Sequence, residues 1–119
     1  MTGLLDTNVA LYLLGGRLAE ALPVGDYGIS VITEMELLAY PTLTTEEEEH
    51  VRRFITNLTI CELTPTVRLR AVALRRAERL KLPDAIIGAT ALEQNVELWT
   101  NDTRLTRISG LRCRTVRLK

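Results

Sequence analysis

Four acidic residues stand where short apolar runs end or where the next helix-like segment begins. Asp6 directly follows the apolar run in GLLDTNVALYLL, and Asp102 follows the run that ends in WT. Glu36 lies in ISVITEMELLAY, and Asp84 begins the segment after Pro83. If these carboxylates share one pocket, their repulsion calls for a cation, and oxygen ligands favour Mg²⁺ or Mn²⁺ over zinc or copper. Such a site supports attack of water on a phosphate ester or phosphodiester.

Each acid also has a purely structural interpretation. The three aspartates suit the start of a helix, where a carboxylate accepts a hydrogen bond from a free backbone N–H and meets the positive end of the helix dipole. Glu36 has the spacing to form a capping box with Thr33. Taken singly, these interpretations are the simpler ones. The presence of four such acids, each near the end of an apolar run, favours the metal site.

Other kinds of catalytic site find little support. His50 is the only histidine and is predicted at the surface, so Ser30 and Thr100 have no neighbouring base that would activate them as nucleophiles. No glycine-rich phosphate loop is present. Cys61 and Cys113 do not form a C-x-x-C motif, which argues against a zinc or redox site and predicts two free thiols.

Short apolar runs alternate with helical patterns along the chain. The runs predict strands at Gly3–Leu5, Tyr27–Ser30, Thr59–Leu63, Glu97–Thr100 and Thr115–Leu118. Helices are predicted over residues 7–14, 33–40, 45–57, 66–81 and 84–94, and the apolar stripe of the fourth is Leu69, Ala73, Ala77 and Leu80. This alternation indicates a parallel sheet covered by helices on both faces. Ligands of such sheets bind at the carboxyl ends of the strands, so Asp6 and Asp102 face one crevice if the first and fourth strands are neighbours.

Length and composition describe an ordinary globular protein. The 119 residues suit a single domain over residues 1–119, and no apolar run approaches the roughly 20 residues that cross a bilayer. The N-terminus lacks the pattern of a signal peptide, so a cytoplasmic location is predicted. The net charge is zero, but it is unevenly distributed. Residues 1–60 carry three basic and nine acidic side chains, a charge of −6, and residues 61–119 carry twelve basic and six acidic ones, a charge of +6.

Four segments, in this order and spacing, resemble the PIN-domain ribonucleases, and among them the VapC-type toxins of type II toxin–antitoxin systems. The segments are LLDTNVAL at 4–11, ISVITEMELLAY at 29–40, LPDAIIGATAL at 82–92 and LWTNDTRL at 98–105. Together they cover essentially the whole chain. The resemblance implies a three-layer α/β/α fold with a parallel sheet of about five short strands in the order 3-2-1-4-5.

The resemblance also implies roles for individual residues. The catalytic set is Asp6, Glu36, Asp84 and Asp102, of which the three aspartates bind Mg²⁺ or Mn²⁺ for hydrolysis of RNA. Glu34 is excluded because it lies about 200° around a helix from Glu36. Thr7 and Asn8 match the polar pair beside the first acid, with Asn8 orienting that acid, and Thr100 supports the site.

Two kinds of partner are implied besides the RNA substrate. VapC-like proteins are similar in forming homodimers and in being inhibited by a VapB-like antitoxin, a segment of which lies over the acidic pocket. The apolar segments VALYLL and ELLAY are expected to leave patches that one small sheet does not cover, which predicts a homodimer through these early helices.

The chain departs from many relatives at one point. They carry a further acid two residues after the last aspartate, followed by an aromatic residue, where this chain has Arg104 and Leu105. The change removes a possible ligand of a second metal ion. Arg104 and Arg107 are instead candidates for contacts with RNA phosphates.

Two alternative functions remain open to different degrees. A haloacid-dehalogenase phosphatase needs a second acid two residues after the first, and Asn8 stands there, which argues against that class. A catalytically degenerate PIN-like or receiver-like binding module would cut nothing. Metal-dependent RNA cleavage that is lost on Asp6→Asn separates this last alternative from a nuclease.

Overall fold

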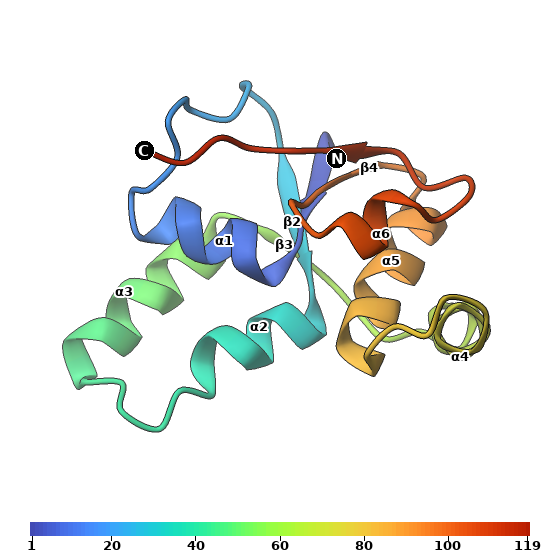
Figure 1. Ribbon diagram of the computed structural model, residues 1–119. Coiled ribbons are helices and arrows are strands. Elements are labelled where there is room, and N and C mark those ends of the chain that lie inside the picture. The colour runs from blue at the N-terminus through green and yellow to red at the C-terminus, as the bar shows by residue number, and fades with distance from the viewer.

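A five-stranded parallel sheet lies between two layers of helices in the computed structural model, which covers residues 1–119 (Figure 1). The strands are β1 (Gly3–Leu5), β2 (Tyr27–Ser30), β3 (Thr59–Cys61), β4 (Glu97–Trp99) and β5 (Cys113–Arg114). The helices are α1 (Thr7–Leu14), α2 (Val31–Leu38), α3 (Thr45–Thr56), α4 (Pro65–Glu78), α5 (Leu82–Gln94) and α6 (Thr103–Thr106). The strand order is β3-β2-β1-β4-β5, and every neighbouring pair is parallel. The predicted α/β/α fold and 3-2-1-4-5 order are confirmed.

The two faces of the sheet have separate hydrophobic cores. Successive side chains of a strand point to opposite faces, so Leu4 and Leu5 of the central strand, both fully buried, belong to different cores. Leu4 packs with residues of α4, α5 and α6. Leu5 packs with residues of α1, α2 and α3, the three helices on the other side of the sheet (Figure 1). Burial on both faces is why the strands are apolar throughout rather than alternating.

The strands β1 and β2 run directly into helices at the same edge of the sheet. Asp6 caps α1 by accepting a hydrogen bond from the Val9 N–H, and Ser30 caps α2 through the Ile32 N–H. Because Ser30 is the cap, α2 begins at Val31 and not at residue 33. The possible capping box of Thr33 and Glu36 is therefore absent, and both side chains are available for other contacts.

Three predicted strands are too long or misplaced. The strand β3 ends at Cys61 and not at Leu63, because Cys61 pairs with Ser30, the last residue of β2. The strand β4 ends at Trp99 rather than at Thr100. The last strand is Cys113–Arg114, not Thr115–Leu118.

Side-chain pairing decides where the last strand ends. After Arg114 the backbone N–H and C=O of Val116 are both bound by the Asn101 side-chain amide, which replaces a ladder partner. Leu118 forms an isolated antiparallel bridge with Leu18. The apolar run at the C-terminus therefore belongs to a connection along the edge of the sheet.

The helix α4 buries a different face from the one predicted. It packs through Val67 and Ala71 against the core, whereas Leu69, on the predicted stripe, is 75 % exposed. Residues two apart point about 200° away from each other on a helix, so the two stripes compete for the same core. Of the predicted stripe, Leu80 is fully buried, but it lies beyond the end of α4.

The helix α4 ends at an arginine with left-handed backbone geometry. Arg79 has φ 55° and ψ 36°, a conformation that favours glycine because it has no Cβ. We expect Arg79→Gly to stabilise the protein by about 0.5–1 kcal/mol in urea denaturation. Arg76→Gly, inside the same helix, is the matched control and should destabilise by about 1 kcal/mol. If both substitutions changed the free energy of unfolding in the same direction, the left-handed geometry of Arg79 would not explain the effect at the helix end.

Both cysteines are free, as predicted. Cys61 lies in β3 and Cys113 in β5, the two opposite edge strands of the sheet. None of the six helices combines the length and the apolar character that crossing a bilayer requires.

Candidate active site

The four predicted acids line one cavity at the carboxyl edge of the sheet. The cavity has a volume of about 510 Å³. Its charged walls are Asp6, Glu36, Lys81, Asp84, Asp102 and Arg104, and the rest of its lining is Thr7, Asn8, Leu11, Ala39, Tyr40, Pro41 and Pro83. The acids come from four different segments, which follow β1, β2 and β4 or begin α5. The neighbouring positions of β1, β2 and β4 in the sheet therefore bring distant parts of the chain together.

Asp6 is the most buried of the four acids, with 5 % of its surface exposed. Its Oδ1 accepts a 2.8 Å hydrogen bond from the Val9 N–H, so the predicted capping role is real. Its Oδ2 accepts a hydrogen bond from the hydroxyl of Thr100, the buried residue that follows β4. The two bonds fix the carboxylate between β1 and β4, and they confirm that Thr100 contacts the predicted site.

Glu36 is held by a chain of two threonines. The Thr7 hydroxyl donates to Glu36 Oε1 at 2.6 Å, and its oxygen lies 2.9 Å from that of Thr33. Because a hydroxyl has one hydrogen and Thr7 gives it to the carboxylate, Thr33 donates to Thr7. These hydrogen bonds hold the Glu36 side chain against the cavity, whereas Glu34 is not among the residues that line the cavity.

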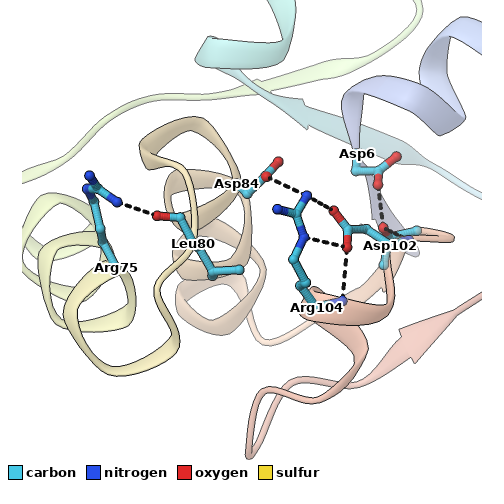
Figure 2. A network of polar contacts seen from close by, with 7 residues as sticks. Asp6, Arg75, Leu80, Asp84, Asp102 and Arg104 are labelled. Atoms are coloured by element: carbon cyan, nitrogen blue, oxygen red, sulfur yellow. Dashed lines mark hydrogen bonds and ion pairs between the residues drawn. The ribbon is translucent and has the colours of Figure 1, made fainter.

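Asp102 and Arg104 form a compact pair at the start of α6 (Figure 2). Asp102 Oδ1 accepts hydrogen bonds from the Arg104 backbone N–H at 2.9 Å and from its Nε at 3.2 Å, and Oδ2 accepts one from Nη2 at 2.9 Å. The same Nη2 lies 3.7 Å from Asp84 Oδ2, so the guanidinium spans the gap between the two aspartates. Arg104 is thus bound to the acids and is not simply a solvated side chain.

The electrostatic surroundings divide the aspartates into two kinds. Burial raises the pKa of Asp6, and the charges of Asp102 and Asp84 raise it further, against the effect of its two hydrogen bonds. Burial and the Asp102 charge likewise raise the pKa of Asp84. The side-chain hydrogen bonds from Arg104 lower the pKa of Asp102. Asp102 is therefore the aspartate that Arg104 compensates most strongly, whereas at Asp84 the effects of burial and of the Asp102 charge outweigh those of Arg104 and Lys81.

Not all of the predicted supporting and RNA-binding residues line the cavity. Thr7, Asn8 and Arg104 line the cavity, but Arg107, the exposed residue that ends α6, does not. The hydrogen bonds to the Asp6 carboxylate come from Val9 and Thr100 and not from Asn8, so the orienting role of Asn8 stays a prediction.

Sequence reasoning missed Lys81 and Thr33. Lys81 precedes α5 and lines the cavity, although a cation at the start of a helix faces the positive end of the dipole. Because this position is unfavourable for a cation, the sequence did contain a signal that the Lys81 charge contributes to a site rather than to the helix. Thr33 gave no signal, because its contact with Thr7 spans 26 positions in the sequence.

The residue types fit a hard divalent cation. The cavity offers carboxylate oxygens and no histidine or cysteine, the donor set that suits Mg²⁺ or Mn²⁺. No three acidic, histidine or cysteine side chains converge closely enough to form a ready-made cage. Mg²⁺ keeps several waters and is usually bound through one or two carboxylates, so the wide spacing is compatible with it. Asp6 and Asp84 suit it best because a bound cation would relieve their repulsion.

The PIN domain family matches residues 3–111, a span that includes all four acids. The chain belongs to the PIN domain family. PIN domains are generally nucleases, and the resemblance found in the sequence is confirmed. No match was found among the curated proteins.

Solved structures contain chains similar to this PIN domain along almost their whole length. A toxin–antitoxin complex from Klebsiella pneumoniae contains a chain with 34 % sequence identity and a TM-score of 0.79, and the match covers 92 % of this chain and 95 % of that one. VapBC2 from Rickettsia felis, bound to a DNA fragment from its promoter, matches with 19 % identity, a TM-score of 0.81 and coverage of 98 % and 100 %. VapBC-1 from nontypeable Haemophilus influenzae matches with 21 % identity, a TM-score of 0.77 and coverage of 97 % and 98 %. The last two likenesses concern the fold alone.

Proposed function

We propose that this single PIN domain is a metal-dependent endoribonuclease, the VapC-like toxin of a type II toxin–antitoxin pair. The observation that carries the proposal is the convergence of four carboxylates on one cavity in a chain of this family. The likeness to a chain of the Klebsiella pneumoniae toxin–antitoxin complex supports the toxin role. The reaction is hydrolysis of an RNA phosphodiester bond in the cytoplasm.

The four acids have different proposed roles, which follow from their different surroundings. Asp6 and Asp84, with raised pKa values, hold Mg²⁺ or Mn²⁺, and Asp102 completes the site. When bound, the ion lowers the pKa of the attacking water and stabilises the charge on the phosphate. Glu36, fixed by Thr7, faces the cavity from the opposite helix layer and positions the water or accepts its proton. Thr100 keeps the Asp6 carboxylate in place.

The partners follow from the toxin role. A VapB-like antitoxin would neutralise the enzyme by laying a segment over the acidic cavity. We also propose a homodimer through α1 and α2. Two exposed apolar side chains support it, Met35 on α2 and Tyr40 just beyond the end of α2, which are 59 % and 50 % exposed. Most apolar residues of α1 and α2 pack into the core instead, so these two side chains carry the proposed contact.

Replacing Glu36 tests the proposed chemistry against a matched control on the same helix. Glu36→Gln should slow cleavage of a fluorescent single-stranded RNA by about 10- to 100-fold, because it removes a charged group that faces the cavity. Glu34→Gln makes the same change outside the cavity and should cleave at the parental rate. Cleavage should require millimolar Mg²⁺ or Mn²⁺ and stop in chelator. A parent that cuts no RNA with either ion would favour the degenerate PIN-like binding module.

Arg107 tests the proposed contacts with RNA phosphates. It lies outside the cavity but close enough for its charge to lower the pKa of Asp102. Arg107→Gln should reduce the slope of log K against log salt by about 0.7 for single-stranded RNA, equally for different sequences, because phosphate contacts do not read bases. Arg68→Gln, on the exposed side of α4, should leave the slope unchanged. Equal slopes for the parent and Arg107→Gln would remove Arg107 from the RNA-binding surface.

A further inference from the structure

Arg104 is hydrogen-bonded to one of the four carboxylates of the cavity, that of Asp102. Three N–H groups of Arg104 donate to Asp102, and between them they bind both carboxylate oxygens. Paired guanidinium–carboxylate bonds of this kind are among the stronger hydrogen bonds of proteins and are directional. A cation approaching Asp102 therefore has to displace hydrogen bonds that the chain already makes.

The position of Arg104 is fixed by its neighbours in the fold. Asp102 is the cap of α6, so the carboxylate is tied to the backbone as well as to the guanidinium. The next residue, Leu105, is 1 % exposed and anchors the short helix in the core. From this base the side chain reaches across to α5, where its Nη2 lies 3.7 Å from Asp84 Oδ2 (Figure 2). The guanidinium therefore places a positive charge between two carboxylates from different elements.

The charge of the cavity indicates how many ions it holds. Its walls carry four carboxylates, Lys81 and Arg104, so the formal charge is −2 when all groups are ionised. One divalent ion neutralises this charge, and a second would leave an excess of two positive charges in a partly buried site. An acid in place of Arg104 would change the wall charge to −4, which two divalent ions would balance. Crowded carboxylates are tolerated to the extent that cations offset their repulsion.

We propose that Arg104 is a built-in cation that takes the place of a second metal ion. It offsets the negative charge of Asp102 and of Asp84 Oδ2. The cavity is thereby restricted to one divalent ion, bound mainly through Asp6 and Asp84. This inference rests on the proposed metal-dependent function and adds the number of ions and the group that sets it. Arg104 is a positioning residue here, because it acts through the acids that hold the ion.

Counting bound Mn²⁺ tests the proposal without measuring activity. Free Mn²⁺ is followed by its electron paramagnetic resonance signal while the metal-free protein is titrated. The parent should bind one ion, and Arg104→Asp should bind two. Arg68→Asp, on the exposed side of α4 and outside the cavity, makes the same change in charge and should still bind one. A third variant, Arg104→Gln, should bind one ion about tenfold more tightly than the parent, because it frees Asp102 and removes one positive charge from the cavity.

The outcomes separate this inference from the function on which it rests. A parent that binds no Mn²⁺ overturns the proposed metal-dependent function. A parent that binds one ion, with Arg104→Asp also binding one, overturns only the role of Arg104, as does a parent that binds two. Circular dichroism establishes that each variant is folded. If Arg104→Asp does not fold, an unchanged affinity of Arg104→Gln overturns the proposal, because a purely structural ion pair would change the melting temperature and not the metal affinity.

Discussion

Replacing Asp6 with Asn is expected to abolish RNA cleavage and to raise the melting temperature of the metal-free protein. Asp6 is 5 % exposed and has two other aspartates for neighbours, so its charge is costly when no cation is bound. Asn removes that charge but still caps α1, because its side-chain oxygen can accept the Val9 N–H. Cleavage should fall at least about a hundredfold, since even residues that only orient metal ligands change activity by 10- to 100-fold.

The pH dependence of stability gives the sign of the Asp6 effect. The pKa of Asp6 is raised above 3.8 in the folded state, so the folded protein holds this proton more strongly than the unfolded chain does. The resulting stabilisation is complete below pH 3.8 and is lost as the pH rises through the folded pKa. The Asp6 contribution should therefore raise the melting temperature of the metal-free parent as the pH falls from neutral, against the opposite contributions of Asp102 and Glu47, whose pKa values are lowered. Asp6→Asn should lack the Asp6 contribution. Asp84 contributes with the same sign.

Two measurements check this result. Thermal melting in chelator compares Asp6→Asn with Asp26→Asn, which removes the same charge from an exposed loop and should leave both melting and cleavage unchanged. Adding millimolar Mn²⁺ should raise the melting temperature of the parent by mass action and that of Asp6→Asn much less. A lower melting temperature for metal-free Asp6→Asn would show that its charge does not destabilise the fold.

Leu80→Ala should cost about 2.7–5 kcal/mol of unfolding free energy, whereas Leu69→Ala should change it by less than about 0.5 kcal/mol. Leu80 is fully buried in the core beneath α4 and α5, and its removal leaves a cavity. Its backbone C=O also accepts a 2.6 Å hydrogen bond from Arg75, which holds the turn after α4 in place (Figure 2). Leu69 is 75 % exposed, so its truncation removes little buried surface.

Urea denaturation of the parent and the two variants compares the same substitution at two nearby positions. Losses of similar size at Leu69 and Leu80 would mean that α4 packs through the stripe predicted from the sequence. That result would contradict the observed packing through Val67 and Ala71.

The sequence by itself identified what depends on local order along the chain. Asp6 follows an apolar run and caps the next helix, and both properties are readable from a few neighbouring residues. The helices α1 and α3 begin where predicted, the latter because Thr44 and Glu47 form the capping box that their spacing indicates. The four acids were likewise found from their places at the ends of runs and from the resemblance of the surrounding segments.

Tertiary structure decided everything that depends on which distant segments meet. The two stripes of α4 are similarly apolar in sequence, and only packing against α5 buries Val67 rather than Leu69. The strand β5 has two residues and the helix α6 has four, too few for any periodic pattern, so their places follow from pairing with β4 and from the burial of Leu105.

The same distinction between sequence and tertiary structure applies to the candidate active site. Sequence indicated that Asp102 and Asp84 belong together, but not that Arg104 lies between them, because that contact depends on the turn at α6 and on the distance to α5. The chain of Thr33, Thr7 and Glu36 likewise joins two helices that are far apart in sequence. Local patterns determine which side chains a strand delivers to the edge of the sheet, whereas hydrogen bonds and ion pairs require atoms within about 3–4 Å, a distance that only the packed fold sets.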